Sequence, residues 1–107
     1  MIKKIILFAG CAVFFTAGMV QAANPAAGKE KSKSCAACHG VDGNSTAPDF
    51  PRIAGQHYDY LVKALSDYKT GERKNAIMAP QAANLTKRDI EDLAAYFSRQ
   101  QGLVVKY

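Results

Sequence analysis

Two cysteines and a histidine lie close together in the segment Cys35-Ala36-Ala37-Cys38-His39. The 107-residue chain has one other cysteine, Cys11, in an apolar stretch near its N-terminus, and one other histidine, His57. A Cys-x-x-Cys pair can form a disulfide, take part in thiol redox chemistry or supply half of a zinc site. A zinc site is disfavoured because the chain lacks a second pair of ligands. A thioredoxin-like site is disfavoured because no strand-like alternation surrounds the motif.

The histidine directly after the second cysteine favours another chemistry, the covalent attachment of haem. Each thiol of Cys35 and Cys38 would add across one vinyl group, and the two intervening residues let both sulfurs reach adjacent edges of the ring. His39 would then stand beneath the iron and offer an imidazole nitrogen as an axial ligand. The motif therefore predicts one haem c per chain, attached through Cys35 and Cys38.

The second axial ligand is predicted to be Met78. It is the one methionine that remains if an N-terminal leader containing Met1 and Met19 is removed. A lone methionine often only fills a gap in a core, but Met78 lies in a short segment without helical periodicity, residues 75–80. A thioether is a soft ligand suited to haem iron, and Met/His ligation raises the reduction potential. His57 is the competing ligand, and its place just before a helix is more typical of a surface residue.

The N-terminal residues 1–22 are typical of a secretory signal peptide. Lys3 and Lys4 precede an apolar run of 16 residues, 5–20, and Val20-Gln21-Ala22 resembles a cleavage site. The run is shorter than the ~20 residues of a membrane-spanning helix. Lipid attachment at Cys11 is disfavoured because the apolar run continues for nine residues beyond it. We therefore expect export to the periplasm and a single domain over residues 23–107.

A domain of that size sits near the limit at which side chains alone make a sufficient core. The chain has no tryptophan, and beyond the leader its phenylalanines are Phe50 and Phe97. A buried haem ring would supply the apolar volume that these side chains do not.

The charge balance argues against a nucleic-acid partner. Without Lys3 and Lys4, 12 basic residues face 9 acidic ones, a net charge of +3 that two haem propionates would reduce further. Nucleic-acid binding usually needs a stronger basic patch. Seven basic residues could form a basic rim near the haem edge that steers an acidic redox partner, or simply belong to an ordinary solvated surface. They are Lys29, Lys31, Lys33, Arg73, Lys74, Lys87 and Arg88.

The elements that must position these groups are predicted to be three helices and a long loop. A first helix begins with Asn24 as N-cap and Pro25 at its first position, and runs toward Cys35. Residues 35–56 are predicted to be a loop, a length that favours a functional role. A second helix is expected over residues 58–69 and a third over about 87–101, capped by Thr86. This pattern predicts an all-α fold.

The chain from Gly28 to Gln101 resembles a class I cytochrome c, close to small periplasmic bacterial members and to one domain of the cytochrome c4 type. Besides Cys35-Ala36-Ala37-Cys38-His39-Gly40, the resemblance rests on the segments 51–56, 73–78 and 93–97. It implies that the Pro51 carbonyl hydrogen-bonds the His39 imidazole and that Met78 is the distal ligand. It also implies that the C-terminal helix crosses the first helix where Gly28 allows close approach to Tyr96. Lys31-Ser32 departs from the bulky residues of many relatives, which predicts a less well packed crossing.

These observations predict a monohaem electron carrier, not an enzyme, whose iron alternates between the ferrous and ferric states. Two alternatives stay open. One is a haem domain with a labile distal ligand that works as a peroxidase or small-ligand sensor. The other is a dedicated subunit of a larger oxidoreductase. The expected partners are a redox donor and acceptor. The chain itself is expected to be a monomer or weak dimer, with membrane association only if the leader is retained or lipidated.

Overall fold

The computed structural model describes residues 2–14 and 22–102, and all regular structure within them is helical. The elements follow in the order α1 (Pro25–Lys31), the 3₁₀ turn η1 (Ser32–Ser34), α2 (Ala36–His39), α3 (Tyr58–Thr70), α4 (Met78–Ala83) and α5 (Lys87–Ser98). The all-α prediction is confirmed for this part of the chain.

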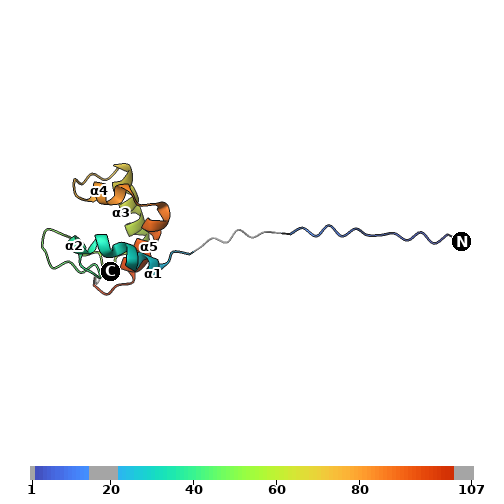
Figure 1. The fold of residues 1–107 in the computed structure, drawn as a ribbon, viewed down its shortest axis with the longest axis horizontal. Helices are drawn as coiled ribbons and strands as arrows, with labels where there is room; N and C mark the ends of the chain where they lie inside the picture. Colours follow the sequence, from blue (N-terminus) through green and yellow to red (C-terminus); the bar gives the residue numbers. More distant parts are fainter. Residues whose placement is uncertain (1, 15–21, 103–107) are drawn as a thin grey trace.

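Residues 2–14 are exposed and lead away from the helical domain (Figure 1). Within the described ranges, no helix is long and apolar enough to cross a bilayer. Of the predicted cleavage segment, Val20 and Gln21 lie outside the described residues, as does the end of the predicted domain, residues 103–107.

The first and last helices of the domain, α1 and α5, cross in close contact. Asn24 caps α1 as predicted, since its side-chain oxygen accepts hydrogen bonds from the backbone N–H groups of Ala26 and Ala27. Gly28 is buried at the crossing. A Cβ placed on it would collide with the backbone carbonyl of Asp92 and come within 2.9 Å of Tyr96 Cβ. The predicted close approach of Gly28 to Tyr96 is thus confirmed.

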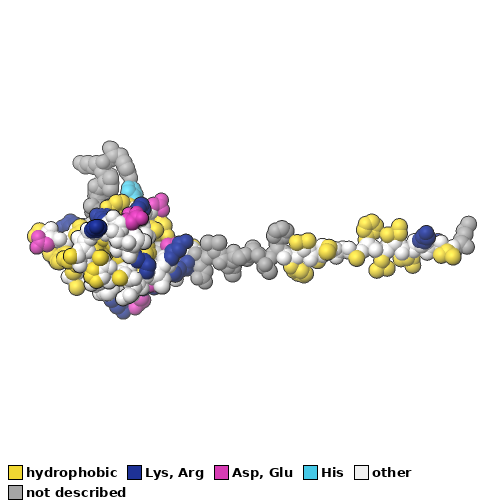
Figure 2. All heavy atoms as spheres, turned by 90° about the horizontal axis from the view of Figure 1, so that it is seen from above, with side chains coloured by type: hydrophobic (Ala, Val, Ile, Leu, Met, Phe, Trp, Pro, Cys, Tyr) yellow, Lys and Arg dark blue, Asp and Glu magenta, His cyan; other side chains and the backbone are white. Residues whose placement is uncertain are grey.

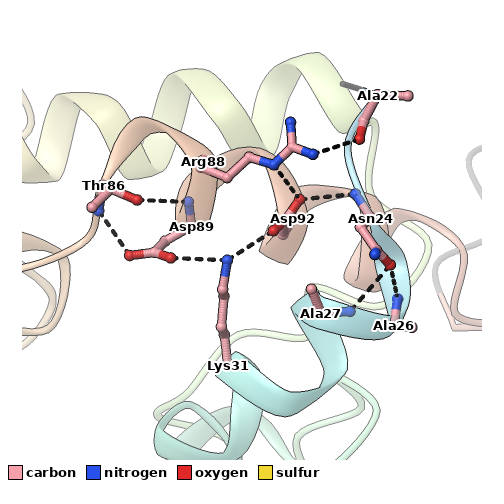
Figure 3. Close-up of polar contacts among 9 residues, drawn as sticks. All are labelled: Ala22, Asn24, Ala26, Ala27, Lys31, Thr86, Arg88, Asp89 and Asp92. Atoms are coloured by element: carbon pink, nitrogen blue, oxygen red, sulfur yellow. Dashed lines mark hydrogen bonds and ion pairs between the residues drawn. The ribbon is translucent and has the colours of Figure 1, made fainter. Parts of the chain in front are cut away.

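A polar network beside Gly28 joins the same two helices (Figure 3). Asp92 is buried, and its carboxylate accepts hydrogen bonds from the backbone N–H of Asn24 at 2.8 Å and from Lys31 Nζ at 2.7 Å. Lys31 Nζ also lies 2.9 Å from Asp89 Oδ1, and Arg88 Nε lies 3.5 Å from Asp92 Oδ1. The expected loosening of the crossing at Lys31-Ser32 is therefore wrong, because Lys31 bridges to two carboxylates of α5 and Ser32 is itself buried.

This network also sets the ionisation of its two carboxylates. The hydrogen bond from Lys31 and those within the Thr86 cap lower the pKa of Asp89 to about 2. Burial raises the pKa of Asp92, but the hydrogen bonds from the Asn24 backbone and Lys31 outweigh it and leave that pKa below its usual range. Both groups are therefore ionised at neutral pH.

The first helix is shorter than predicted, because it ends at Lys31 and does not continue toward Cys35. Ser32 Oγ donates a hydrogen bond to the Lys29 carbonyl at 2.6 Å, and Ser34 Oγ donates to the Lys31 carbonyl at 3.4 Å. Serine hydroxyls that bond the preceding turn compete with the regular helical pattern, and the chain tightens here into η1. The segment that carries the cysteines then starts a separate turn, α2.

The core lies between α3 and α5. Its fully buried cluster consists of Leu61, Leu93, Ala94, Tyr96 and Phe97. Cys35 and Ile53 are among the partly buried side chains that pack against it. The inner face of the last helix is buried and includes Ile90, Leu93, Ala94 and Phe97, and this helix ends at Ser98 and not near Gln101 as expected.

Hydrogen bonds join the long loop between α2 and α3 to α5. Tyr96 Oη donates to the Val41 carbonyl at 2.9 Å, and the Gly55 N–H donates to the Phe97 carbonyl at 2.9 Å. Within the loop, the Gly43 carbonyl accepts from the N–H groups of Ile53 and Ala54. These bonds tie the loop to α5 near both of its ends and hold Gly43 against Ile53 and Ala54.

Candidate functional site

The imidazole of His39 is held by one hydrogen bond in a buried position. His39 is only 8% exposed, and its Nδ1 lies 2.8 Å from the Pro51 carbonyl oxygen. A carbonyl oxygen can only accept, so Nδ1 carries the proton and donates it. The other ring nitrogen, Nε2, is then left with a lone pair for a metal, and the ring is fixed in that tautomer.

The two cysteines lie on the same helical turn as His39. The N–H groups of Cys38 and His39 both bond the Cys35 carbonyl, at 3.3 and 2.9 Å, so residues 35, 38 and 39 share one face of the turn. Both thiols are free and half-buried. Burial raises the pKa of the Cys35 thiol, a contact with the Ser34 hydroxyl opposes this to a lesser extent, and the thiol stays protonated at neutral pH.

Met78 lies on a different element, at the first position of α4. Residues 75–80 were expected to be a loop, and that expectation is wrong from Met78 onward, where the chain is helical. The local reason is Asn75, whose Oδ1 accepts hydrogen bonds from the N–H groups of Ile77 and Met78, both at 2.9 Å. These two bonds hold the chain in a turn directly before α4, and an Asn shortly before a helix is a sequence signal for such a turn.

The structure thus brings four of the five predicted site residues together. His39, Pro51 and the two cysteines form one group, while α4 with Met78 packs on α3 and is separated from α2 in Figure 1. Met78 is half-buried, whereas Ile77 beside it is 54% exposed. His57 is exposed at the N-cap of α3, as its position before a helix predicted.

The basic rim, one of the two arrangements that the sequence left open, has several members engaged in contacts within the chain. Four of its members bind groups of the chain itself: Lys31 and Arg88 pair with Asp92, Lys33 pairs with Glu30, and Arg73 contacts Tyr60 and Tyr68. Figure 2 shows basic and acidic side chains interspersed over the face that it presents. An ordinary mixed surface is therefore the better description of that face.

The residues fit a covalently bound haem. Two free thiols and an imidazole with one available nitrogen share a single turn, which is the donor set that haem attachment requires. Beside this turn, the loop that carries Pro51 lines a surface hollow with Ser45, Thr46, Ala47, Pro48, Phe50, Pro51 and Arg52. Its mixed lining offers apolar contact from Pro48 and Phe50 and a guanidinium from Arg52.

An all-α domain built around a Cys-x-x-Cys-His turn, with the imidazole braced by a loop carbonyl, defines a c-type haem protein. The chain belongs to the cytochrome c family, whose model matches residues 25–100. The cofactor of this family is haem c, and Cys35 and Cys38 are present in the arrangement that attaches it.

Known relatives agree with this assignment. Cytochrome c4 of Pseudomonas aeruginosa is 47% identical over 85 residues, which are 78% of this chain and 42% of that protein. Cytochrome c-554(548) of Halomonas halodenitrificans is 43% identical over 83 residues, which are 75% of this chain and the whole of that protein. The crystal structure of reduced recombinant cytochrome c4 from Pseudomonas stutzeri matches with a TM-score of 0.73 and 47% identity, over 78% of this chain and 48% of that one. The chain therefore spans about half the length of the cytochrome c4 relatives that it matches, but all of cytochrome c-554(548).

Proposed function

We propose that this chain is a monohaem electron carrier in which His39 and Met78 bind the two axial positions of the iron. The observation that carries the proposal is the 2.8 Å hydrogen bond from His39 Nδ1 to the Pro51 carbonyl, made by a buried ring on the turn that bears both thiols. An imidazole fixed in this way offers Nε2 and nothing else. The Pro51 carbonyl, which accepts the Nδ1–H hydrogen bond, raises the basicity of the imidazole as a ligand.

When bound, haem c supplies an iron that alternates between the ferrous and ferric states. The role of the protein is to hold the haem in the same way in both oxidation states. Cys35 and Cys38 anchor it, and the Pro51 carbonyl keeps His39 in one orientation. Met78 supplies a thioether, which favours the reduced state and raises the potential. If His39 and Met78 both bound the iron, a small ligand would find no open position, and this would favour a carrier over a peroxidase or sensor.

The proposal includes export to the periplasm, with residues 1–22 as a cleaved leader and the haem domain from residue 23 onward. The support is the sequence pattern of two lysines, an apolar run and small residues at Val20-Gln21-Ala22. Asn24, the second residue of the proposed mature chain, is bound to the helical domain, since its N–H donates to the Asp92 carboxylate. N-terminal sequencing of the protein from a periplasmic extract should begin at Ala23.

The partners are proposed to be redox proteins, and not nucleic acid. Two further relatives carry names that point to enzymes as electron donors. One is the cytochrome subunit of sulfide dehydrogenase of Chlorobaculum tepidum, 41% identical over 70 residues. The other is the thiosulfate dehydrogenase electron acceptor of Stutzerimonas stutzeri, 43% identical over 74 residues. The first of these names favours a dedicated subunit as the second candidate function. Size-exclusion chromatography of the native extract separates such a subunit from a freely diffusing monomer or weak dimer.

Carbon monoxide binding tests the central proposal. The dithionite-reduced holoprotein should keep the same absorption spectrum under carbon monoxide near neutral pH, because Met78 closes the distal position. A spectrum that shifts readily on adding carbon monoxide would refute the carrier and favour the sensor or peroxidase.

A further inference from the structure

The short helix that bears Met78 is held at its far end by a side chain from another helix. Lys69, near the end of α3, extends its Nζ to the carbonyl oxygens of Ala83 and Leu85, and the Ala83 distance is 3.2 Å. Ala83 is the last residue of α4, and Leu85 follows two residues later. Lys69 therefore binds the chain at the point where α4 ends.

The carbonyl groups at the end of a helix lack partners within it, and a cation placed there both bonds them and complements the helix dipole. Such a bond at the helix end matters more for the stability of α4 than for that of a long helix. With six residues and Pro80 inside it, α4 is far below the length at which a helix is stable by itself. Its existence depends on contacts with the rest of the domain.

Three such contacts can be identified. Asn75 Oδ1 accepts from the N–H groups of Ile77 and Met78 at the start of α4, Ala82 near its end is completely buried, and Lys69 bonds the carbonyl of its last residue. Asn75 lies in the segment directly before α4 and bonds only the start of that helix, so it does not tie α4 to another element. Lys69 instead belongs to α3, which is anchored in the core through Leu61. Among these polar contacts, the Lys69 bond is the one that ties the direction of α4 to the core.

We propose that Lys69 is a positioning residue for Met78. By fixing the end of α4 against α3, it holds the first turn of α4 in place and so keeps the Met78 thioether available to the iron. The inference rests on the proposed role of Met78 as the distal ligand. It predicts that losing the Lys69 ammonium weakens the hold of Met78 on the iron without unfolding the domain.

The test measures how easily imidazole displaces Met78 in the oxidised holoprotein. Loss of the weak long-wavelength absorption of sulfur-to-ferric-iron ligation is followed against imidazole concentration, with far-ultraviolet circular dichroism on the same samples. Lys69→Met keeps the aliphatic stem and removes the ammonium together with its bonds to the Ala83 and Leu85 carbonyls. Half of the band should then be lost at an imidazole concentration about threefold to tenfold lower, the effect of losing exposed hydrogen bonds from one charged donor. Lys69→Arg retains a cationic donor and should restore most of the resistance.

Lys63→Met is the matched control. Lys63 lies on the same helix, and its contact is with Asp67 on α3 itself, so its removal should leave imidazole displacement unchanged. Equal displacement curves for wild type and Lys69→Met would overturn the proposal, and so would a loss of the band that coincides with loss of helical signal. Met78→Ala separates this failure from failure of the proposed function: if that variant keeps the band, Met78 is not the ligand at all.

Discussion

Replacing Lys31 with methionine tests whether the polar network, and not apolar packing alone, holds α1 against α5. The change keeps the length of the side chain and removes its ammonium. Asp92 then loses the Lys31 hydrogen bond of 2.7 Å and keeps the Asn24 backbone N–H and the more distant Arg88. A carboxylate whose side chain is 3% exposed is left with fewer donors than its charge requires.

The size of the effect follows from this burial. Removing one partner of a fully buried ion pair costs about 3–5 kcal/mol, because the remaining charge stays desolvated. The Lys31 side chain is 30% exposed, so water partly replaces it, and two donors to Asp92 remain. We therefore expect a loss of about 2 kcal/mol in the free energy of unfolding, well above the value of a surface pair. For a domain of this size that corresponds to a fall in Tm of about 8–16 °C.

The assay is thermal unfolding of the holoprotein, followed by circular dichroism at neutral pH. Lys33→Met is the matched control, since the Lys33–Glu30 pair of 2.8 Å lies on the same stretch of chain with side chains that are 76% and 70% exposed. It should leave Tm nearly unchanged. If both variants lower Tm equally, or if Lys31→Met has no effect, the buried Asp92 is not held by Lys31 and the reasoning fails.

Three further outcomes are expected. Cys35→Ala combined with Cys38→Ala should yield little holoprotein, whereas acid-acetone extraction of the wild type should leave the haem on the polypeptide, and free haem in the extract would refute the attachment. Met78→Ala should lower the reduction potential in a voltammetric titration and allow carbon monoxide to bind the iron. His57→Ala should change neither property. The reverse pattern would identify His57, and not Met78, as the distal ligand. Because the pKa of Asp89 is about 2 in the fold and about 3.9 in an unfolded chain, its contribution to stability is complete above about pH 4 and lost as pH falls toward 2. Tm of Asp89→Asn should therefore depend less on pH in that window than Tm of the wild type.

Most of the fold was predictable because it depends on local rules. The Asn24 cap, the Thr86 cap and the apolar face of α5 are each specified by neighbouring residues, and the structure has all of them. The break of the first helix after Lys31 was not predicted, because two serine hydroxyls compete with the backbone there and propensity alone does not resolve that competition.

The sequence predicted the chemistry of the candidate site better than the distant residues that hold its helices in place. The Cys-x-x-Cys-His spacing specifies an attachment turn, and the contact of His39 with Pro51 followed from a family resemblance. The buried Asp92 was missed because it pairs with Lys31 across 61 positions of sequence, and no local pattern reports such a partner. The same holds for Lys69 and the end of α4, where the donor and the carbonyls lie 14 and 16 positions apart.

The contact between α1 and α5 also has a consequence for the order in which the domain can form. The N–H of Asn24 bonds the carboxylate of Asp92 across 68 positions, so the start of the first helix is completed by a residue of the last. A chain that emerges with its N-terminus first cannot close this crossing until nearly all of it is available, and contacts of such long range form late. During that interval the turn with Cys35 and Cys38 lacks the finished core against which Cys35 packs. Both thiols are then accessible to whatever machinery attaches the cofactor, before the arrival of α5 closes the domain.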